Sequence, residues 1–298
     1  MSEKTNIAWT DSTHNFWRGC TKISPGCQNC YAETLVTNRL QGEWGKGKPR
    51  IRIKDFDAPL AWNKKPWICD ECGAARTNAY DDCEQCSLPD PHMGFRSPTC
   101  HRRRVFSLSL GDIGDPEAPL EWFNEAMVIV DKCRDLTFQL LTKRPVDFLA
   151  RWKQVAVHWG RTDFNLPTNV WMGTSVENQA TADSRIPELL KIPARVRFLS
   201  VEPLLEGVDF PDVAALDWVI AGGESGPGAR PCYQEWIREI VYQCKTTETA
   251  CFVKQLGANS MTYQTREKDW KPFKEKKGGD MAEWPNDLRV RQFPKESR

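Results

Sequence analysis

The stretch VRFLSVEPLLEGVDFPDVAALDWVIAGG, residues 196–223, decides the fold class. It contains two short apolar runs, VRFLSV (196–201) and DWVIAGG (217–223), and each run is followed by a carboxylate, Glu202 or Glu224. Near-continuous apolar runs of this length are typical of strands buried on both faces of a parallel sheet. The stretch therefore predicts two strands of an α/β fold with acidic side chains at their carboxyl ends.

The same rhythm continues through most of the chain. Helix candidates begin at Asp115-Pro116 and after Pro145, Asn178 and Pro231. About seven strand–helix units predict a full or partial parallel βα barrel, and a doubly wound sheet is the alternative. We expect a first unit at 1–62, an insert at 63–104, the remaining barrel at 105–257 and a polar tail at 258–298. The other strand candidates are NIAWT (6–10), VFSLSL (105–110), TFQLLT (137–142), NVWMGTSV (169–176) and CFVKQLG (251–257).

Composition narrows the functional classes. The chain has 298 residues, of which 40% are apolar and 27% charged, with a net charge of +1, so any nucleic-acid surface must be a local patch. No apolar run has the length of a membrane span, and the first residues lack the apolar core of a signal peptide. We expect a cytoplasmic protein without a membrane partner. In that reducing compartment, clusters among the twelve cysteines indicate metal binding rather than disulfides.

The first cluster lies in FWRGCTKISPGCQNCYAET, residues 16–34, and contains Cys20, Cys27 and Cys30. A helix is expected from about Cys30, with Cys27 and Cys30 on one side of its first turn, where free N–H groups stabilise thiolates. Three thiolates are one ligand short of a closed tetrahedral site. A [4Fe–4S] cluster with one open iron is the favoured interpretation. A zinc site completed by His14 or a distant cysteine is the alternative.

The second cluster pairs two C-x-x-C knuckles, Cys69 with Cys72 and Cys83 with Cys86. This spacing predicts a closed, zinc-ribbon-like structural site, and a second iron–sulfur cluster is the alternative. The basic run His101–Arg104 beside it suggests contact with nucleic acid.

Polar residues at the ends of the predicted strands form the candidate active site, because catalytic groups of a βα barrel gather there. The glycine-rich loop AGGESGPGAR (221–230) could bind a carboxylate, phosphate or ribose through its N–H groups. We assign catalytic roles to Asp112, Lys143 and Glu202. Cofactor contacts are assigned to Ser175, Glu177, Asn178, Gly222, Gly223 and Glu224.

Three cysteines after the first strand of a βα barrel resemble the radical S-adenosylmethionine (SAM) superfamily. The resemblance implies that the open iron chelates SAM and that an electron donor drives its cleavage to a radical that abstracts hydrogen from a substrate. The spacing here is C-x6-C-x2-C rather than C-x3-C-x2-C, and the usual aromatic before the third cysteine is Asn29. More narrowly, the chain resembles a phage- and prophage-borne family of three-cysteine barrel proteins. That resemblance rests on GCTKISPGCQNCYAE, LTKRP, NVWMGTSVENQ, ADSRIPELL, VRFLSVEPLL, DWVIAGGESGPGARP and FVKQLG.

Together with the resemblance, which implies SAM as a cofactor, these patterns predict an iron–sulfur enzyme of the radical SAM type. Zinc is the further cofactor, and nucleic acid is the substrate that we favour. Two alternatives stay open. One is a non-catalytic barrel stapled by zinc at both clusters, which binds nucleic acid or a partner protein. The other is a metal-independent hydrolase that uses Asp112 and Glu202 as paired carboxylates.

Overall fold

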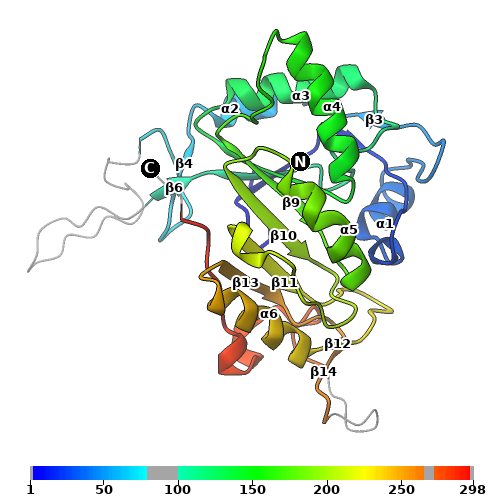
Figure 1. The fold of residues 1–298 in the computed structure, drawn as a ribbon, viewed down its shortest axis with the longest axis vertical. Coiled ribbons are helices and arrows are strands. Elements are labelled where there is room, and N and C mark those ends of the chain that lie inside the picture. Colours follow the sequence, from blue (N-terminus) through cyan, green and yellow to red (C-terminus); the bar gives the residue numbers. More distant parts are fainter. Residues whose placement is uncertain (1–2, 79–99, 265–271, 296–298) are drawn as a thin grey trace, which may run out of the picture.

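A seven-stranded, all-parallel sheet forms the centre of the molecule (Figure 1). The computed structural model describes residues 3–78, 100–264 and 272–295. The strands lie in the order β1-β7-β8-β9-β10-β11-β13, so neighbours in space follow their order in the chain. The strands are β1 (Ser12–His14), β7 (Arg104–Ser107), β8 (Thr137–Thr142), β9 (Val170–Ser175), β10 (Val196–Val201), β11 (Trp218–Gly222) and β13 (Ala250–Gln255).

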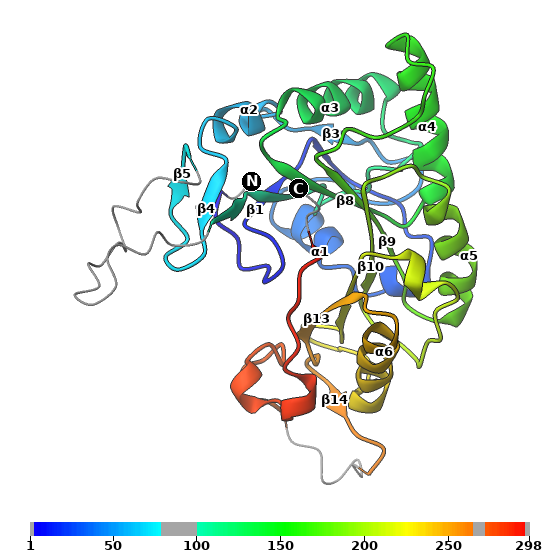
Figure 2. The same ribbon diagram turned by 60° about the vertical axis from the view of Figure 1, so that its left-hand side comes forward.

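The sheet curls into a half-barrel with helices around its outer face (Figure 2). Within the described residues β1 and β13 do not pair, so the sheet stays open. The predicted α/β class and parallel sheet are confirmed, whereas the doubly wound alternative is wrong because the strand order never reverses. The outer helices are α3 (Leu120–Lys132), α4 (Pro145–His158), α5 (Gln179–Leu190) and α6 (Gln234–Thr246).

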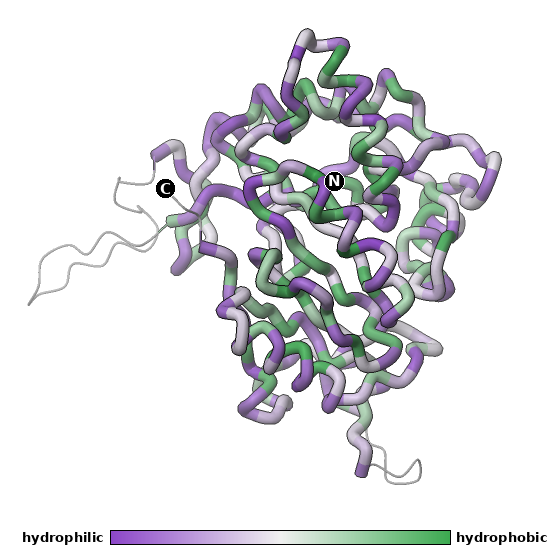
Figure 3. The backbone as a smooth tube through the Cα atoms, in the orientation of Figure 1, coloured by the Kyte–Doolittle hydropathy of each residue, from purple (hydrophilic) through white to green (hydrophobic). Residues whose placement is uncertain are grey.

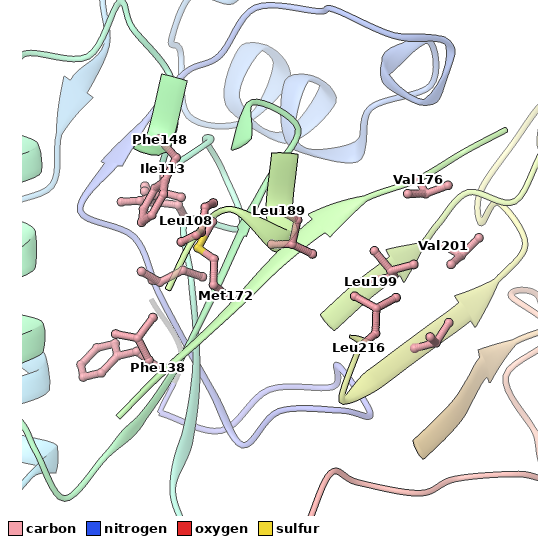
Figure 4. Close-up of a cluster of buried hydrophobic side chains, with 14 of the residues drawn as sticks. Leu108, Ile113, Phe138, Phe148, Met172, Val176, Leu189, Leu199, Val201 and Leu216 are labelled. Atoms are coloured by element: carbon pink, nitrogen blue, oxygen red, sulfur yellow. The ribbon is translucent and has the colours of Figure 1, made fainter. Parts of the chain in front are cut away.

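The main core fills the space between the sheet and the outer helices. Phe138, Met172 and Leu199 project from adjacent strands toward this layer, and Phe148 and Leu189 come from α4 and α5 (Figure 4). All five side chains are fully buried. Apolar and polar residues alternate along these helices in Figure 3, as expected of helices with one face on a core.

Side chains alternate between the two faces of each strand. Successive side chains on the inner face of the half-barrel form two layers. The lower layer, here called the aromatic floor, is a buried cluster on the other face of the strands from the main core. In β10, Phe198 belongs to the floor, while Ser200 on the same face lines the cavity. In β9, Gly173 has no side chain because the Phe198 ring fills its space. Phe293 packs against the floor, which contains Trp9, Phe106, Trp171, Val196, Phe198, Trp218, Ile220 and Phe252.

One predicted strand and one predicted helix start do not appear in the structure. The predicted strand at 6–10 is wrong, because Thr10 turns back to donate its N–H to the oxygen of Ile7 and Trp9 packs in the aromatic floor. The predicted helix start at Asp115 is also wrong, since Asp115 pairs with buried Arg50 and α3 begins at Leu120. Helix starts at Pro145 and Asn178 are confirmed.

Smaller elements surround the sheet. Cys30 is the N-cap of α1, as predicted, but Cys27 ends a preceding 3-10 turn and lies outside the first turn of α1. The bounds are β2 (Trp17–Arg18), α1 (Tyr31–Asn38), β3 (Ile51–Arg52), α2 (Ala58–Trp62), β4 (Trp67–Cys69), β5 (Ala75–Arg76), β6 (Cys100–Arg102), β12 (Cys232–Tyr233) and β14 (Ser260–Met261).

Residues 272–295, the described end of the predicted tail, lie along the open edge of β13. Val253 donates its N–H to Val290 O at 2.8 Å, and Gln292 donates to Cys251 O at 2.8 Å. Phe252 and Arg291 form an antiparallel bridge. None of the helices within the described ranges combines the length and apolar composition that a bilayer crossing requires.

Candidate functional site

A cavity of about 1500 Å³ opens at the carboxyl ends of the parallel strands. All three cysteines of the first loop line it, and so do four of the predicted strand-end residues. The structure therefore brings together residues that lie far apart in the sequence, as a βα architecture does at this end of the sheet. The predicted residues that line the cavity are Cys20, Cys27, Cys30, Asp112, Lys143, Ser175 and Glu202.

Cys20 lies beside an arginine–aspartate pair. Arg144 Nη1 is 3.5 Å from Cys20 Sγ and 3.1 Å from Asp112 Oδ2, and Arg144 Nη2 donates to Thr21 O at 2.7 Å. Burial raises the pKa of the Cys20 thiol to about 12, the charge of Asp112 adds to this effect, and Arg144 opposes it. Arg144 thus ties the cysteine loop to the end of β8.

Asp112 is held by the protein on both carboxylate oxygens. Besides Arg144, its partners are the Thr142 hydroxyl, the Gly114 N–H at 2.8 Å and the Lys143 N–H at 2.9 Å. These contacts fix its orientation at the wall of the cavity. In this arrangement the carboxylate joins the segment after β7 to the end of β8.

Glu177 holds the cysteine loop through a hydrogen bond and does not line the cavity. The Ser24 hydroxyl donates to Glu177 Oε1, and Arg185 Nη1 donates to Glu177 Oε2 at 2.7 Å. The Glu177 side chain is fully buried, and a Cβ on Gly26 would overlap it. The predicted cofactor residue therefore holds the turn that carries Cys27.

Cys30 lies at the start of α1. Burial raises the pKa of the Cys30 thiol, and the N–H groups of Glu33 and Ala32 counter this. The next residue, Tyr31, also lines the cavity, and its hydroxyl donates to Ser109 O at 2.8 Å. The three thiols share the cavity, but no group of three His, Cys, Asp or Glu side chains in the described part of the chain is gathered closely enough to bind a metal ion.

The glycine-rich loop after β11 locks onto the cysteine loop. Arg230 Nη2 donates to Glu224 Oε1 at 2.6 Å, and Arg230 Nη1 donates to Pro25 O at 2.9 Å. Asn29 also donates to Glu224. Burial alone would raise the pKa of Glu224, but the hydrogen bonds from Arg230 and Asn29 outweigh it and lower the pKa.

The remaining predicted cofactor residues do not line the cavity but stabilise the elements around it. Asn178 caps α5 in a capping box with Thr181. Gly222 and Gly223 pack closely against the end of β13, where a Cβ would meet Gln255 or Leu256. From the same loop, Ser225, Gly226 and Pro227 do line the cavity. His14, the candidate fourth metal ligand, bonds to Phe56 O at 3.1 Å and packs against aromatic rings outside the cavity lining.

Sequence reasoning missed part of the lining. Trp44 and the tail residues Lys276 and Lys277 line the cavity, although they lie outside every predicted strand end. Glu202, which was predicted, pairs with Lys254 at 2.8 Å. The register of β10 and β13 across β11 was needed to show that pair. No local signal marks Trp44 or the two lysines, since only the folded path of their segments brings them there.

The described half of the second cysteine cluster, Cys69 and Cys72, lies at a separate three-stranded antiparallel sheet, β5-β4-β6. Cys69 donates its N–H to Ala74 O at 3.0 Å, and Gly73, at a φ of 69°, returns its N–H to Cys69 O at 2.9 Å. This tight hairpin presents Cys69 and Cys72, and Cys100 lies directly opposite Cys69. The predicted ligands Cys83 and Cys86 lie outside the described residues.

The profile of a family described as "Protein of unknown function (DUF5131)" matches residues 4–285. The chain belongs to the DUF5131 family. The DUF5131 match includes both cysteine clusters, all seven strands of the half-barrel and the tail lysines at the cavity. Neither the search of curated proteins nor the search of solved structures gave a match.

Proposed function

We propose that this DUF5131 chain is an iron–sulfur enzyme of the radical SAM type, in which Cys20, Cys27 and Cys30 hold a [4Fe–4S] cluster. One observation carries the proposal. The three thiols line a cavity at the carboxyl ends of parallel strands, together with polar residues from four of those strands. Three cysteines leave a cluster with one open iron, and the cavity has room for SAM and a substrate beside it.

The surroundings of the thiols support the donor set. Arg144 supplies a positive charge beside Cys20, and the Ala32 and Glu33 N–H groups face Cys30. Such donors stabilise anionic sulfur and tune a bound cluster. The loop must draw the thiols together on binding, and their raised pKa values mean that binding releases protons. When bound, the cluster would supply the electron that cleaves SAM.

The chain's own residues would position SAM and the substrate. Ser175 and Glu202 face the cavity from β9 and from the residue after β10, where they offer hydrogen bonds to polar groups of SAM. Lys143 lines the wall, 4.0 Å from Glu177, and presents an ammonium to an anionic group. The half-barrel walls exclude water from the reacting atoms on the strand side. We place the reaction in the cytoplasm, where thiol ligands stay reduced.

We also propose that the insert holds a structural zinc. The hairpin at Cys69–Gly73, in which the Gly73 N–H bonds back to Cys69 O, is a tight turn of the kind that a pair of C-x-x-C thiolates needs to bind one metal ion. The small sheet β5-β4-β6 has few apolar side chains of its own, so a metal would supply much of its folding free energy. The alternative function, a zinc-stapled binding module, would place zinc at the first loop too.

Metal analysis of anaerobically purified protein tests the proposal. We expect about four irons with matching sulfide, about one zinc, and a reduced-state EPR signal that SAM perturbs. Cys27→Ala should lose the iron and keep the zinc. Cys72→Ala, the matched control, should lose the zinc and keep the iron.

Two zincs without iron would refute the iron–sulfur proposal and leave the binding module. Activity that survives replacement of all three loop cysteines would instead support a hydrolase built on Asp112 and Glu202. Loss of both metals in Cys27→Ala would contradict two independent sites.

A further inference from the structure

The cavity is larger than a single small ligand requires. Small-molecule sites usually enclose about 300–1,000 Å³, whereas this cavity measures about 1500 Å³. Its lining extends from the cysteine loop across the strand ends to the tail segment at 275–280. The tail side of the cavity therefore offers room for a second occupant, beyond the space that the proposed function assigns to SAM.

Charge identifies the class of that occupant. The positive side chains in the lining outnumber the carboxylates. The carboxylates are engaged, and so are three of the lysines, Lys22 with Glu33, Lys143 with Glu177 and Lys254 with Glu202. Asp112 pairs with Arg144, which lies outside the lining, and Glu202 pairs with Lys254. Glu275 and Asp280 accept backbone N–H groups of their own turn. The cations are Lys4, Lys22, Lys143, Lys254, Lys276, Lys277 and Arg291, and the carboxylates are Asp112, Glu202, Glu275 and Asp280.

Lys276 and Lys277 stand on a fixed turn rather than a loose surface segment. Gly278 O accepts the Leu256 N–H at 2.8 Å and the Trp284 indole N–H at 3.0 Å. Gly278 has a φ of 64°, and its Cβ position is blocked by Gly257 O. Both lysine side chains are exposed, and neither forms an ion pair within the described residues. The fold thus holds, at the edge of the cavity, two ammonium groups without an ion-pair partner in the part of the chain that the structure describes.

The geometry points to a single strand of nucleic acid as the second occupant, with its phosphates along Lys276 and Lys277 and one nucleotide in the cavity. The cations come from the first residues, the cysteine loop, two strand ends and the tail, which suits repeated phosphates better than one. Tyr31 and Trp44 add aromatic faces for a base, and the Trp44 indole N–H has no partner among the described residues. The inference rests on the proposed function only for the chemistry that follows binding.

The test uses fluorescence anisotropy with the full chain and a labelled oligonucleotide of about 15 nucleotides, as DNA and as RNA. Lys276→Glu/Lys277→Glu should weaken binding by roughly tenfold or more and lower the slope of log affinity against log salt by about 1.4. Lys132→Glu/Lys191→Glu, two exposed lysines near the ends of α3 and α5, changes the net charge equally and should bind as the unmodified chain does. Far-UV circular dichroism checks that each variant is folded.

Four outcomes decide the inference. A selective loss in the tail variant supports it. Equal losses in both variants would contradict it, because they would show an attraction to positive charge anywhere on the surface. Absence of binding would also overturn it. If ATP at equal phosphate concentration displaced the oligonucleotide, the occupant would be a single nucleotide and the inference of a strand would be wrong. Lys276→Glu/Lys277→Glu should keep its iron, because both lysines lie on the tail side of the cavity, so failure here and failure of the iron–sulfur proposal remain distinguishable.

Discussion

Gly26 shows how a single residue can control the cysteine loop. A methyl group at this position would overlap the buried side chain of Glu177, which Arg185 holds in place. We predict that Gly26→Ala displaces the turn that carries Cys27, at a cost of about 1–3 kcal/mol in unfolding free energy, with loss of most bound iron. Urea unfolding and iron analysis measure both effects.

Gly207→Ala is the matched control for this prediction. A Cβ there would meet only Trp236 Cδ1 at 3.4 Å, an ordinary contact outside the cavity. That variant should retain iron and stability. If Gly26→Ala retained iron as well, the Glu177 anchor would have no part in cluster binding.

His14 predicts a specific loss of stability in acid. Burial lowers its pKa from 6.5 to about 4, so between these values the unfolded chain binds a proton that the folded chain does not. The free energy of unfolding therefore falls as the pH falls through this window, by about 2 kcal/mol between pH 7 and pH 5. Urea unfolding of the unmodified chain and of His14→Gln, compared at both pH values, isolates this contribution. Parallel losses in the two proteins would rule it out.

For single residues, the sequence predicted which polar side chains lie near the site better than it predicted what each of them does there. The thiols, Asp112, Lys143, Ser175 and Glu202 share one cavity, as their strand-end positions implied. Glu177 and Asn178 also follow a strand, yet the Glu177 side chain holds the cysteine loop and the Asn178 side chain caps α5. Residues after a strand end point alternately into the cavity and into the packing around it, and a sequence does not show where that alternation stops.

At the scale of elements, the N-terminus of α5 can test whether Asn178 stabilises a helix rather than binding a cofactor. Asn178 and Thr181 form a reciprocal capping box. Asn178→Ala should lower the free energy of unfolding by about 1 kcal/mol and leave SAM affinity unchanged, as thermal unfolding and calorimetric titration would show. Ser184→Ala, in the same helix, removes only a hydroxyl that bonds to Thr181 O and should be neutral. A large fall in SAM affinity would instead restore the cofactor role first assigned to Asn178.

Strands were easier to predict than helix starts. Three predicted runs, at 137–142, 169–176 and 196–201, coincide with β8, β9 and β10 to within one residue, because buried parallel strands are continuously apolar. The helix signal at Asp115-Pro116 failed because Asp115 pairs with Arg50, which is 65 residues earlier in the chain. A long-range partner of this kind overrides a local capping preference and leaves no local trace.

At the scale of the whole molecule, the open half-barrel explains what a repeat count could not show. Seven strand units predicted a full or partial barrel, and closure depends on whether the first and last strands meet. Here the tail occupies the free edge of β13 instead. The same tail brings Lys276 and Lys277 to the cavity, so the most informative part of the lining comes from the segment with the weakest sequence pattern.

The aromatic floor has a consequence for how the chain folds. Trp218 packs against Trp9 and Phe293, so this layer joins the first residues, the middle and the last residues of the chain. Contacts between such distant segments form late, because the entropy of closing long loops is lost before they become favourable. During synthesis on the ribosome, the outer wall of strands and helices can assemble first. The floor can be completed only after Phe293 has emerged, and until then the hollow side of the sheet presents exposed aromatic surface to chaperones.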